Sequence, residues 1–206
     1  MRSFLFIAVF ALAARATAGP ILEDQKHLLL FEPLELRINS NVDQGQVFTV
    51  GISGKLARVD VAIAQIIGVT EPLTLDLAKV IAGKPDFSST GIIATRLINQ
   101  STVPLYSHRL LGSFTHSIDF LSSDIPVVVG DKLAIVLRTK QDPSSAYVWF
   151  GNDGAGAYGH MNPTSTVINQ SFTTNFRTFV ESVPEPSAAA ITFLALAGFG
   201  MLRRLL

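Results

Sequence analysis

The stretch that decides the fold is LTLDLAKV, residues 73–80. Leu73, Leu75 and Leu77 alternate with the polar Thr74 and Asp76. Because successive side chains of a strand point to opposite faces, this alternation predicts a strand with one buried face. The leucines are expected in a core, and the polar residues on the other face.

Similar β-rich stretches lie on both sides of it and are separated by turn residues such as Gly54 and Gly130-Asp131. The second of these turns is predicted to be of the hairpin type. Residues 21–31 fit either a short helix or an extended arm. Roughly eight short strands favour an all-β, antiparallel β-sandwich, with a jelly roll as the first expectation. The other predicted strands are 47–52, 56–67, 91–98, 114–120, 125–129, 133–137, 146–150 and 172–180.

The first 18 residues have the pattern of a secretory signal peptide. Arg2 gives a positive start, and 4–14 is an unbroken apolar run that is short for a membrane span. Ala16 and Ala18 then form a small-x-small cleavage site, which places the mature N-terminus at Gly19. The alternatives are a membrane anchor or a buried helix, but length, flanking charge and cleavage site together favour the signal peptide.

The last stretch, residues 183–206, is also tripartite. Val183-Pro184-Glu185-Pro186 is predicted to be an extended linker, because its two prolines disfavour both helix and sheet. Residues 188–202 are almost entirely apolar and predict a short transmembrane helix, somewhat shorter than the ~30 Å hydrocarbon core. Arg203 and Arg204 end it and place the C-terminus in the cytoplasm by the positive-inside rule.

This combination of a Val-Pro-Glu-Pro motif, an apolar helix and a terminal arginine pair resembles the PEP-CTERM sorting signal. The resemblance covers about the last two dozen residues and coincides with an N-terminal signal peptide. It implies sorting by an exosortase, an integral-membrane cysteine protease-transpeptidase of Gram-negative bacteria that make exopolysaccharide. The alternative is an ordinary tail-anchored or single-pass protein, while a GPI signal usually lacks the basic end.

The resemblance also implies a route and a set of partners. The chain is expected to be exported, held in the inner membrane with its domain in the periplasm, and then passed to the cell surface or the extracellular matrix. Signal peptidase, the exosortase, the inner membrane and exopolysaccharide are the expected partners. The domain organisation is therefore a signal peptide at 1–18, a β-sandwich at 19–182 and the sorting signal at 183–206.

Several strands of the central domain are similar to those of an export domain often found ahead of PEP-CTERM tails. This similarity implies a galactose-binding-like or jelly-roll sandwich and names no ligand. The stretches that carry it are Phe48-Thr49-Val50-Gly51, Leu56-Ala57-Arg58-Val59-Asp60, Ile118-Asp119-Phe120, Gly130 to Leu137 and Tyr147-Val148-Trp149-Phe150-Gly151.

Charge and cysteine content exclude several classes of function. The chain has 16 basic and 16 acidic residues, and four of the arginines lie in the two end signals. Residues 19–187 therefore carry 16 − 4 = 12 basic against 16 acidic residues, a net charge of −4. A mildly acidic domain without a basic cluster is a poor partner for nucleic acid. The absence of cysteine excludes disulfides, thiol catalysis and cysteine metal sites.

No catalytic constellation stands out, and we predict that the protein is not an enzyme. The four histidines are far apart in sequence and show no metal-binding spacing, and no Gly-x-Ser-x-Gly motif is present. Paired carboxylates could serve glycoside hydrolysis, and Asp119, Asp124 and Asp131 lie near one another in sequence. Asp124 and Asp131 are more typical of turns, where aspartate makes local hydrogen bonds.

A weak carbohydrate site is the better candidate, because sugars stack on aromatic rings and bond to Asn and Asp. Its residues would be Tyr147, Trp149, Asn152, Asp153 and Tyr158. Packing of Trp149 in the core is the favoured alternative. The loop 39–43 and Asn152-Asp153 offer oxygen atoms to a structural calcium, but neither matches a defined calcium loop, so no metal or cofactor is predicted.

The expected function is that of an exported, non-enzymatic surface or matrix protein associated with exopolysaccharide. A carbohydrate-binding module that grips this polysaccharide is the first alternative. An enzyme acting on glycans is the second.

Overall fold

The computed structural model describes residues 18–28, 34–107, 113–153, 160–161, 168–169 and 172–182. Within Pro20–Val183 the chain forms one compact unit. Nearly all of the predicted signal peptide, and the whole predicted sorting signal with its helix at 188–202, lie outside the described residues. In the part of the chain that the structure describes, no helix is long and apolar enough to cross a membrane.

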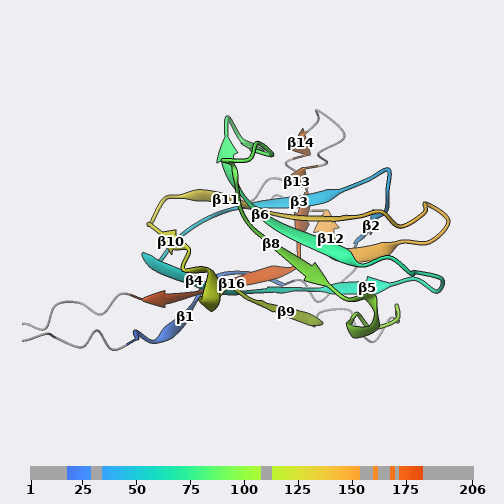
Figure 1. The fold of residues 1–206 in the computed structure, drawn as a ribbon, viewed down its shortest axis with the longest axis horizontal. Coiled ribbons are helices and arrows are strands. Elements are labelled where there is room, and N and C mark those ends of the chain that lie inside the picture. Colours follow the sequence, from blue (N-terminus) through green and yellow to red (C-terminus); the bar gives the residue numbers. More distant parts are fainter. Residues whose placement is uncertain are drawn as a thin grey trace, which may run out of the picture. The chain divides into compact units, whose positions relative to one another are not determined.

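The described strands form three sheets in which every strand pair is antiparallel (Figure 1). The all-β prediction is therefore confirmed for this part of the chain. The first sheet, named here the β4 sheet, has the order β1-β16-β4-β10, with β9 also paired to β4. Its strands are β1 (Ile21–His27), β4 (Gly54–Val61), β9 (His116–Asp119), β10 (Pro126–Val127) and β16 (Phe176–Ser182).

The second sheet, the β11 sheet, has the order β14-β13-β3-β11-β6-β7, and β8 also pairs with β6. The apolar strand β11 is paired on both sides, with β3 and with β6, and so lies inside the sheet. Its strands are β3 (Gln44–Thr49), β6 (Leu73–Ile81), β7 (Lys84–Pro85), β8 (Ile92–Ile98), β11 (Lys132–Thr139), β13 (His160–Met161) and β14 (Ile168–Asn169).

The third sheet, the β12 sheet, has the order β15-β12-β2, with β5 also paired to β12. The strands of the β12 sheet are β2 (Leu34–Ile38), β5 (Ile63–Gln65), β12 (Tyr147–Asp153) and β15 (Phe172–Thr174). Two single-turn 3-10 helices, η1 (Gln100–Thr102) and η3 (Leu121–Ser123), lie in connections between strands.

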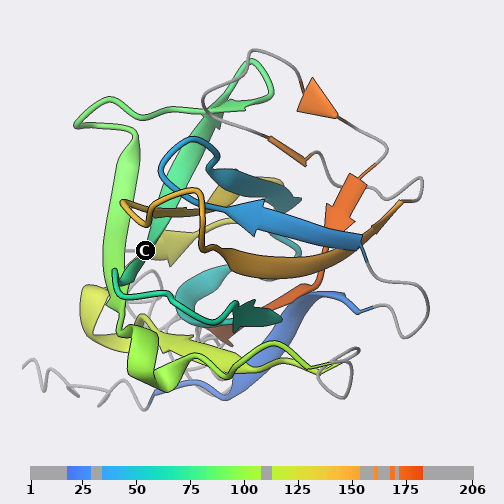
Figure 2. The ribbon, with the colours of Figure 1, turned by 90° about the vertical axis from the view of Figure 1, so that its right-hand side faces the viewer.

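One hydrophobic core joins the three sheets, which Figure 2 shows in layers. The β11 sheet contributes Leu75 and Ile135, the β4 sheet contributes Val59 and Phe176, and the β12 sheet contributes Trp149. These side chains are fully buried in the same cluster. Face-to-face packing of this kind is the arrangement of a β-sandwich, in which the inward side chains of each sheet form the core.

Strand β6 confirms the prediction made from 73–80, because Leu73, Leu75 and Leu77 are all buried in the core. The expectation for its other face is only half right. Thr74 is half-buried as expected, but Asp76 is fully buried. Side chains of the neighbouring strands β8 and β11 cover it. Within 21–31, the extended alternative is correct for Ile21–His27, which is strand β1.

Two predicted single strands, 56–67 and 172–180, are each divided between two sheets. The first changes from the β4 sheet to the β12 sheet at Ala62, and the second changes between the same sheets at Asn175. The Ala62 N–H donates to the Asn175 carbonyl at 3.2 Å, so the two changes occur side by side. Corners of this kind, where a strand leaves one sheet and enters another, are typical of packed sheets.

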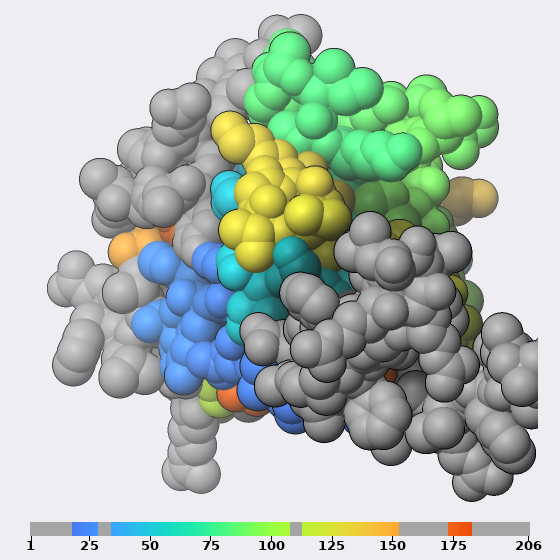
Figure 3. All heavy atoms as spheres, turned by 90° about the vertical axis from the view of Figure 1, so that its left-hand side faces the viewer, coloured from blue at the N-terminus to red at the C-terminus, as the bar shows by residue number. Residues whose placement is uncertain are grey.

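The turn predicted at Gly130-Asp131 exists, but it does not form a hairpin. β10 pairs with β4 and β11 pairs with β3 and β6, so the turn connects two sheets. Gly130 adopts φ +94°, a conformation that favours glycine. Figure 3 shows this loop, in yellow, next to a cyan segment of the chain. The Gly130 N–H donates to the Val50 carbonyl at 2.9 Å and fixes the loop there.

Glycine is required for a different reason at Gly54, the first residue of β4. A Cβ atom at this position would lie 2.2 Å from the carbonyl oxygen of Glu181 on β16. The close approach of two backbones therefore excludes any side chain here.

Candidate functional site

The aromatic residues of β12 belong to the core. Tyr147 and Trp149 are fully buried. Trp149 Nε1–H donates to the Asn175 carbonyl at 3.0 Å, and the Tyr147 hydroxyl donates to the Glu71 carbonyl at 2.5 Å. Burial raises the pKa of Tyr147 to about 12. Neither ring presents a face to a sugar, so the expected carbohydrate site does not hold for these two residues and the core alternative for Trp149 is correct.

The other members of that expected site do not form it in the described structure. Asn152 is half-buried, and its Oδ1 lies 3.4 Å from Nε2 of His27 on β1. Asp153 is described only as backbone, paired with Phe172, and Tyr158 lies outside the described residues. Of the predicted cluster, Tyr147 and Trp149 thus lie in a core strand, and Asn152 makes a contact between β12 and β1.

The loop at 39–43 uses its polar atoms internally. Asn39 Oδ1 accepts the Asn41 N–H at 2.9 Å, and Asn39 and Val42 exchange backbone hydrogen bonds at 3.0 Å. This is an Asx-type turn closed by its own side chain. Among the residues that the structure describes, no group of three or more His, Asp or Glu residues is placed to hold a metal ion.

The two histidines whose side chains are described lie in one row of the β4 sheet without meeting. His27 on β1 is opposite Phe176, which is opposite Val61, which is opposite His116 on β9. Three strand spacings separate them, or about 14 Å. Burial lowers the pKa of both imidazoles. The side chains not described are those of His108 and His160.

The three aspartates close in sequence each have a local partner. Asp131 Oδ2 accepts the Val128 N–H at 2.8 Å, which confirms the interpretation as a turn residue. Asp124 forms an ion pair with Lys55 at 2.5 Å. Asp119 accepts the backbone N–H two residues further on, at 2.7 Å. These contacts indicate that the three aspartates have structural roles in turns and at strand ends.

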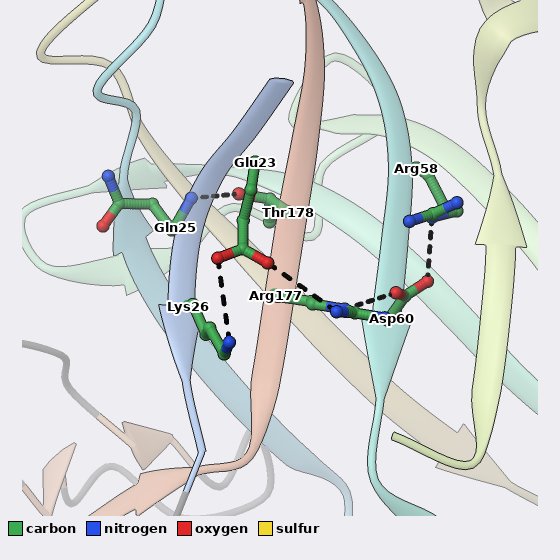
Figure 4. A network of polar contacts seen from close by, with 7 residues as sticks. All are labelled: Glu23, Gln25, Lys26, Arg58, Asp60, Arg177 and Thr178. Carbon is green, nitrogen blue, oxygen red and sulfur yellow. Dashed lines mark hydrogen bonds and ion pairs between the residues drawn. The ribbon is translucent and has the colours of Figure 1, made fainter. Parts of the chain in front are cut away.

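A charged cluster crosses the β4 sheet, and Figure 4 shows its members. Arg177 Nε on β16 donates to Asp60 Oδ2 on β4 at 2.6 Å, while Arg58 Nε lies 3.1 Å from Asp60 Oδ1. The Asp60 side chain is fully buried, whereas those of Arg58 and Arg177 remain 40% and 30% exposed. The Arg58 guanidinium also lies 3.8 Å from the ring centroid of Phe179, and Glu23 on β1 lies 3.7 Å from Arg177. This alternation of charges fastens neighbouring strands, and we interpret it as structural.

The β11 sheet carries a polar pocket of about 520 Å³. Its volume lies within the usual range for small-molecule sites. Strands β6, β8 and β11 and three adjoining loop segments supply its lining. Its charged and polar members are Asp43, Glu71, Thr74, Arg138, Thr139 and Lys140, and its apolar members are Pro72 and Leu97.

The register of the sheet sets the geometry of this pocket. Leu97 on β8, Thr74 on β6 and Arg138 on β11 form one row across three strands. In the next outward row, Thr95 lies opposite Asp76. The Thr95 hydroxyl donates to Asp76 Oδ1 at 2.6 Å, and Arg138 forms an ion pair with Asp76 Oδ2. The buried carboxylate thus holds the Arg138 guanidinium in place at the pocket.

The loop before β6 is held against the sheet by three side chains. Gln141, which is buried, accepts through Oε1 the backbone N–H groups of Thr70 at 2.8 Å and Glu71 at 3.0 Å. The Thr139 hydroxyl donates to the Pro72 carbonyl at 2.8 Å. Together with the Tyr147 hydroxyl, these bonds fix the backbone that presents the Glu71 carboxylate. These bonds therefore order the loop that lines the pocket at Glu71.

The electrostatics of the pocket are mixed. Burial raises the pKa of Asp43, the Arg138 charge opposes that rise, and Asp76 adds to it. With all groups ionised, Asp43, Glu71 and Asp76 outnumber Arg138 and Lys140 by one negative charge. Such a site offers both hydrogen-bond donors and acceptors beside the exposed side chain of Leu97.

Sequence reasoning missed this pocket because its residues come from distant strands. The available signals were Asp76 within a leucine alternation and Arg138 directly after the apolar run 133–137. One charged residue in each of two apolar strands predicts an ion pair only when the pairing register of those strands is known. The register joins these two residues, and Gln141 then holds the neighbouring loop.

The described part of the chain is thus a layered, antiparallel all-β domain with a polar pocket on a sheet face. No protein-family model matches the chain, and no curated protein matches it.

Proposed function

We propose that this chain is an exported, non-enzymatic surface or matrix protein that an exosortase sorts and that associates with exopolysaccharide. Its signal peptide is removed after Ala18, and its tail holds it in the inner membrane until the exosortase acts at Val183-Pro184-Glu185-Pro186. The domain is a jelly roll. Its layered antiparallel sheets and shared core support this finer assignment.

The observation that carries the proposal is the tripartite tail, together with its position directly after the last strand. β16 ends at Ser182, one residue before the motif. Ser182 N–H donates to the Pro20 carbonyl at 3.1 Å, so the residue that precedes the tail lies beside the residue that follows Gly19. Neither predicted end signal includes a strand that the structure describes, so removal of both would leave the described sheets complete.

The proposal predicts that replacing Pro184, Glu185 and Pro186 by alanine leaves the unprocessed chain in the inner membrane. The motif is lost, while the domain and the apolar helix are unchanged. Fractionation of the native bacterium, followed by immunoblotting, measures the ratio of membrane-bound to released chain.

The matched control is Ser187→Ala, which changes the same segment outside the motif and is expected to be processed normally. Wild-type processing and release of the triple alanine variant would show that the exosortase assignment is wrong.

The polar pocket supports a second candidate, a carbohydrate-binding module. It combines hydrogen-bonding groups with an exposed apolar side chain, which is the surface chemistry that a saccharide requires.

A further inference from the structure

We propose that the pocket between Asp43, Glu71, Arg138 and Lys140 binds a non-anionic saccharide unit of a polysaccharide. This inference deepens the proposed function and rests on its association with exopolysaccharide. It moves the binding site from β12, whose aromatic rings are buried, to the outer face of the β11 sheet.

The first argument is the pairing of polar and apolar surface. A pyranose unit presents hydroxyl groups at its edge and C–H groups on its faces. Leu97, whose side chain is 69% exposed, and Pro72 provide an apolar wall for such a face. The pocket therefore combines an apolar wall with hydrogen-bonding groups, as small-molecule sites do.

The second argument is the fixed arrangement of donors and acceptors. The carboxylates of Asp43 and Glu71 accept hydrogen bonds from hydroxyl groups, and Arg138 and Lys140 donate them. Arg138 is held by the buried Asp76, and the backbone at Glu71 is held by Gln141. A site ordered in advance loses less conformational entropy on binding.

The third argument is charge. The pocket lining carries two carboxylates, Asp43 and Glu71, and two cations, Arg138 and Lys140. Arg138 is already paired with the buried Asp76 beneath it, which leaves Lys140 alone to balance the two lining carboxylates. A uronate or sulfated sugar would bring a further negative charge close to Asp43 and Glu71. Like charges brought together in this way oppose binding, so the site selects against polyanions.

The test uses isothermal titration calorimetry on the full chain, purified in mild detergent. Its binding is measured to three polymers: a neutral galactomannan, a neutral glucan and a polyuronate. We expect binding to at least one neutral polymer and at least tenfold weaker binding to the polyuronate. Glu71→Ala and Lys140→Ala are each expected to weaken binding about tenfold, the effect of one lost hydrogen bond to a charged group. Both side chains belong to exposed residues, so the thermal midpoint should stay at the wild-type value.

A gain-of-binding variant makes the test sharper. Leu97→Tyr enlarges the apolar wall with an aromatic face and is expected to tighten binding several-fold. The control is Lys84→Ala, an exposed residue on β7 that does not line the pocket.

Three results would overturn the proposal. They are no binding to any of the polymers, equal or stronger binding to the polyuronate, and unchanged binding in the Glu71 and Lys140 variants. These outcomes are separate from sorting, which is measured by the location of the chain in cells.

Discussion

Trp149→Ala should destabilise the domain by about 3–5 kcal/mol, the usual loss for removing a large aromatic side chain from a core. Trp149 is fully buried, and it lies opposite Leu36 on β2 and Ile63 on β5. The variant leaves a cavity between the packed sheets and removes one of the two N–H groups that donate to the Asn175 carbonyl. Chemical denaturation followed by circular dichroism measures the loss, which is a large fraction of the 5–15 kcal/mol typical of a domain.

Two further variants separate packing from hydrogen bonding. Trp149→Phe keeps much of the ring volume and loses the N–H, so it should cost clearly less than the alanine variant. Phe87→Ala, at a residue that is 38% exposed, should have a small effect. A Trp149→Ala protein with wild-type stability and impaired sugar binding would instead place this ring in a binding site and contradict the structure.

Replacing both Arg58 and Arg177 by methionine should cost about 3 kcal/mol. The fully buried Asp60 carboxylate then loses both cations. An uncompensated buried charge usually costs about 3–5 kcal/mol, and the lower end applies because both arginines are partly exposed and screened by water. Methionine retains much of the apolar stem, so the variant chiefly tests charge. Equilibrium unfolding in urea provides the measurement.

The control for this cluster is Asp60→Asn, which leaves two arginines that can reach water and should therefore cost less than the double methionine variant. Adding Asp60→Asn to that double variant should restore part of the lost stability, because the orphaned charge is gone. A triple variant less stable than the double one would show that the cluster does not act through the Asp60 charge.

The alternation along 73–80 was sufficient to predict β6, and the apolar run at 133–137 was sufficient to predict most of β11. Local pattern determines which residues enter a core, because side-chain alternation is a property of the strand itself. The choice between jelly roll and other sandwiches stays a prediction.

The division of strands at Ala62 and Asn175 could not be predicted, because it depends on which sheet each half joins. The same holds for the loop at Gly130, whose turn chemistry was correctly predicted while its partners were not. Sequence gives a turn its conformation, but long-range pairing decides whether the turn closes a hairpin or connects two sheets.

The candidate site was predicted least well. The aromatic residues Tyr147 and Trp149 have the composition of a sugar site, yet a core with room for large rings buries them. The pocket depends on the pairing of Asp76 with Arg138, which are 62 positions apart in the sequence. Only the register of β6 and β11 brings these two residues together.

The central claim is that the chain is exported and then cut at its tail. The most direct test is the intact mass of the protein released by the native bacterium, measured by mass spectrometry with sequencing of both ends. The account predicts an N-terminus at Gly19 and a C-terminus at or near 183–186, without Arg203 and Arg204. A released chain that still ends at Leu206, or that still begins at Met1, would contradict it.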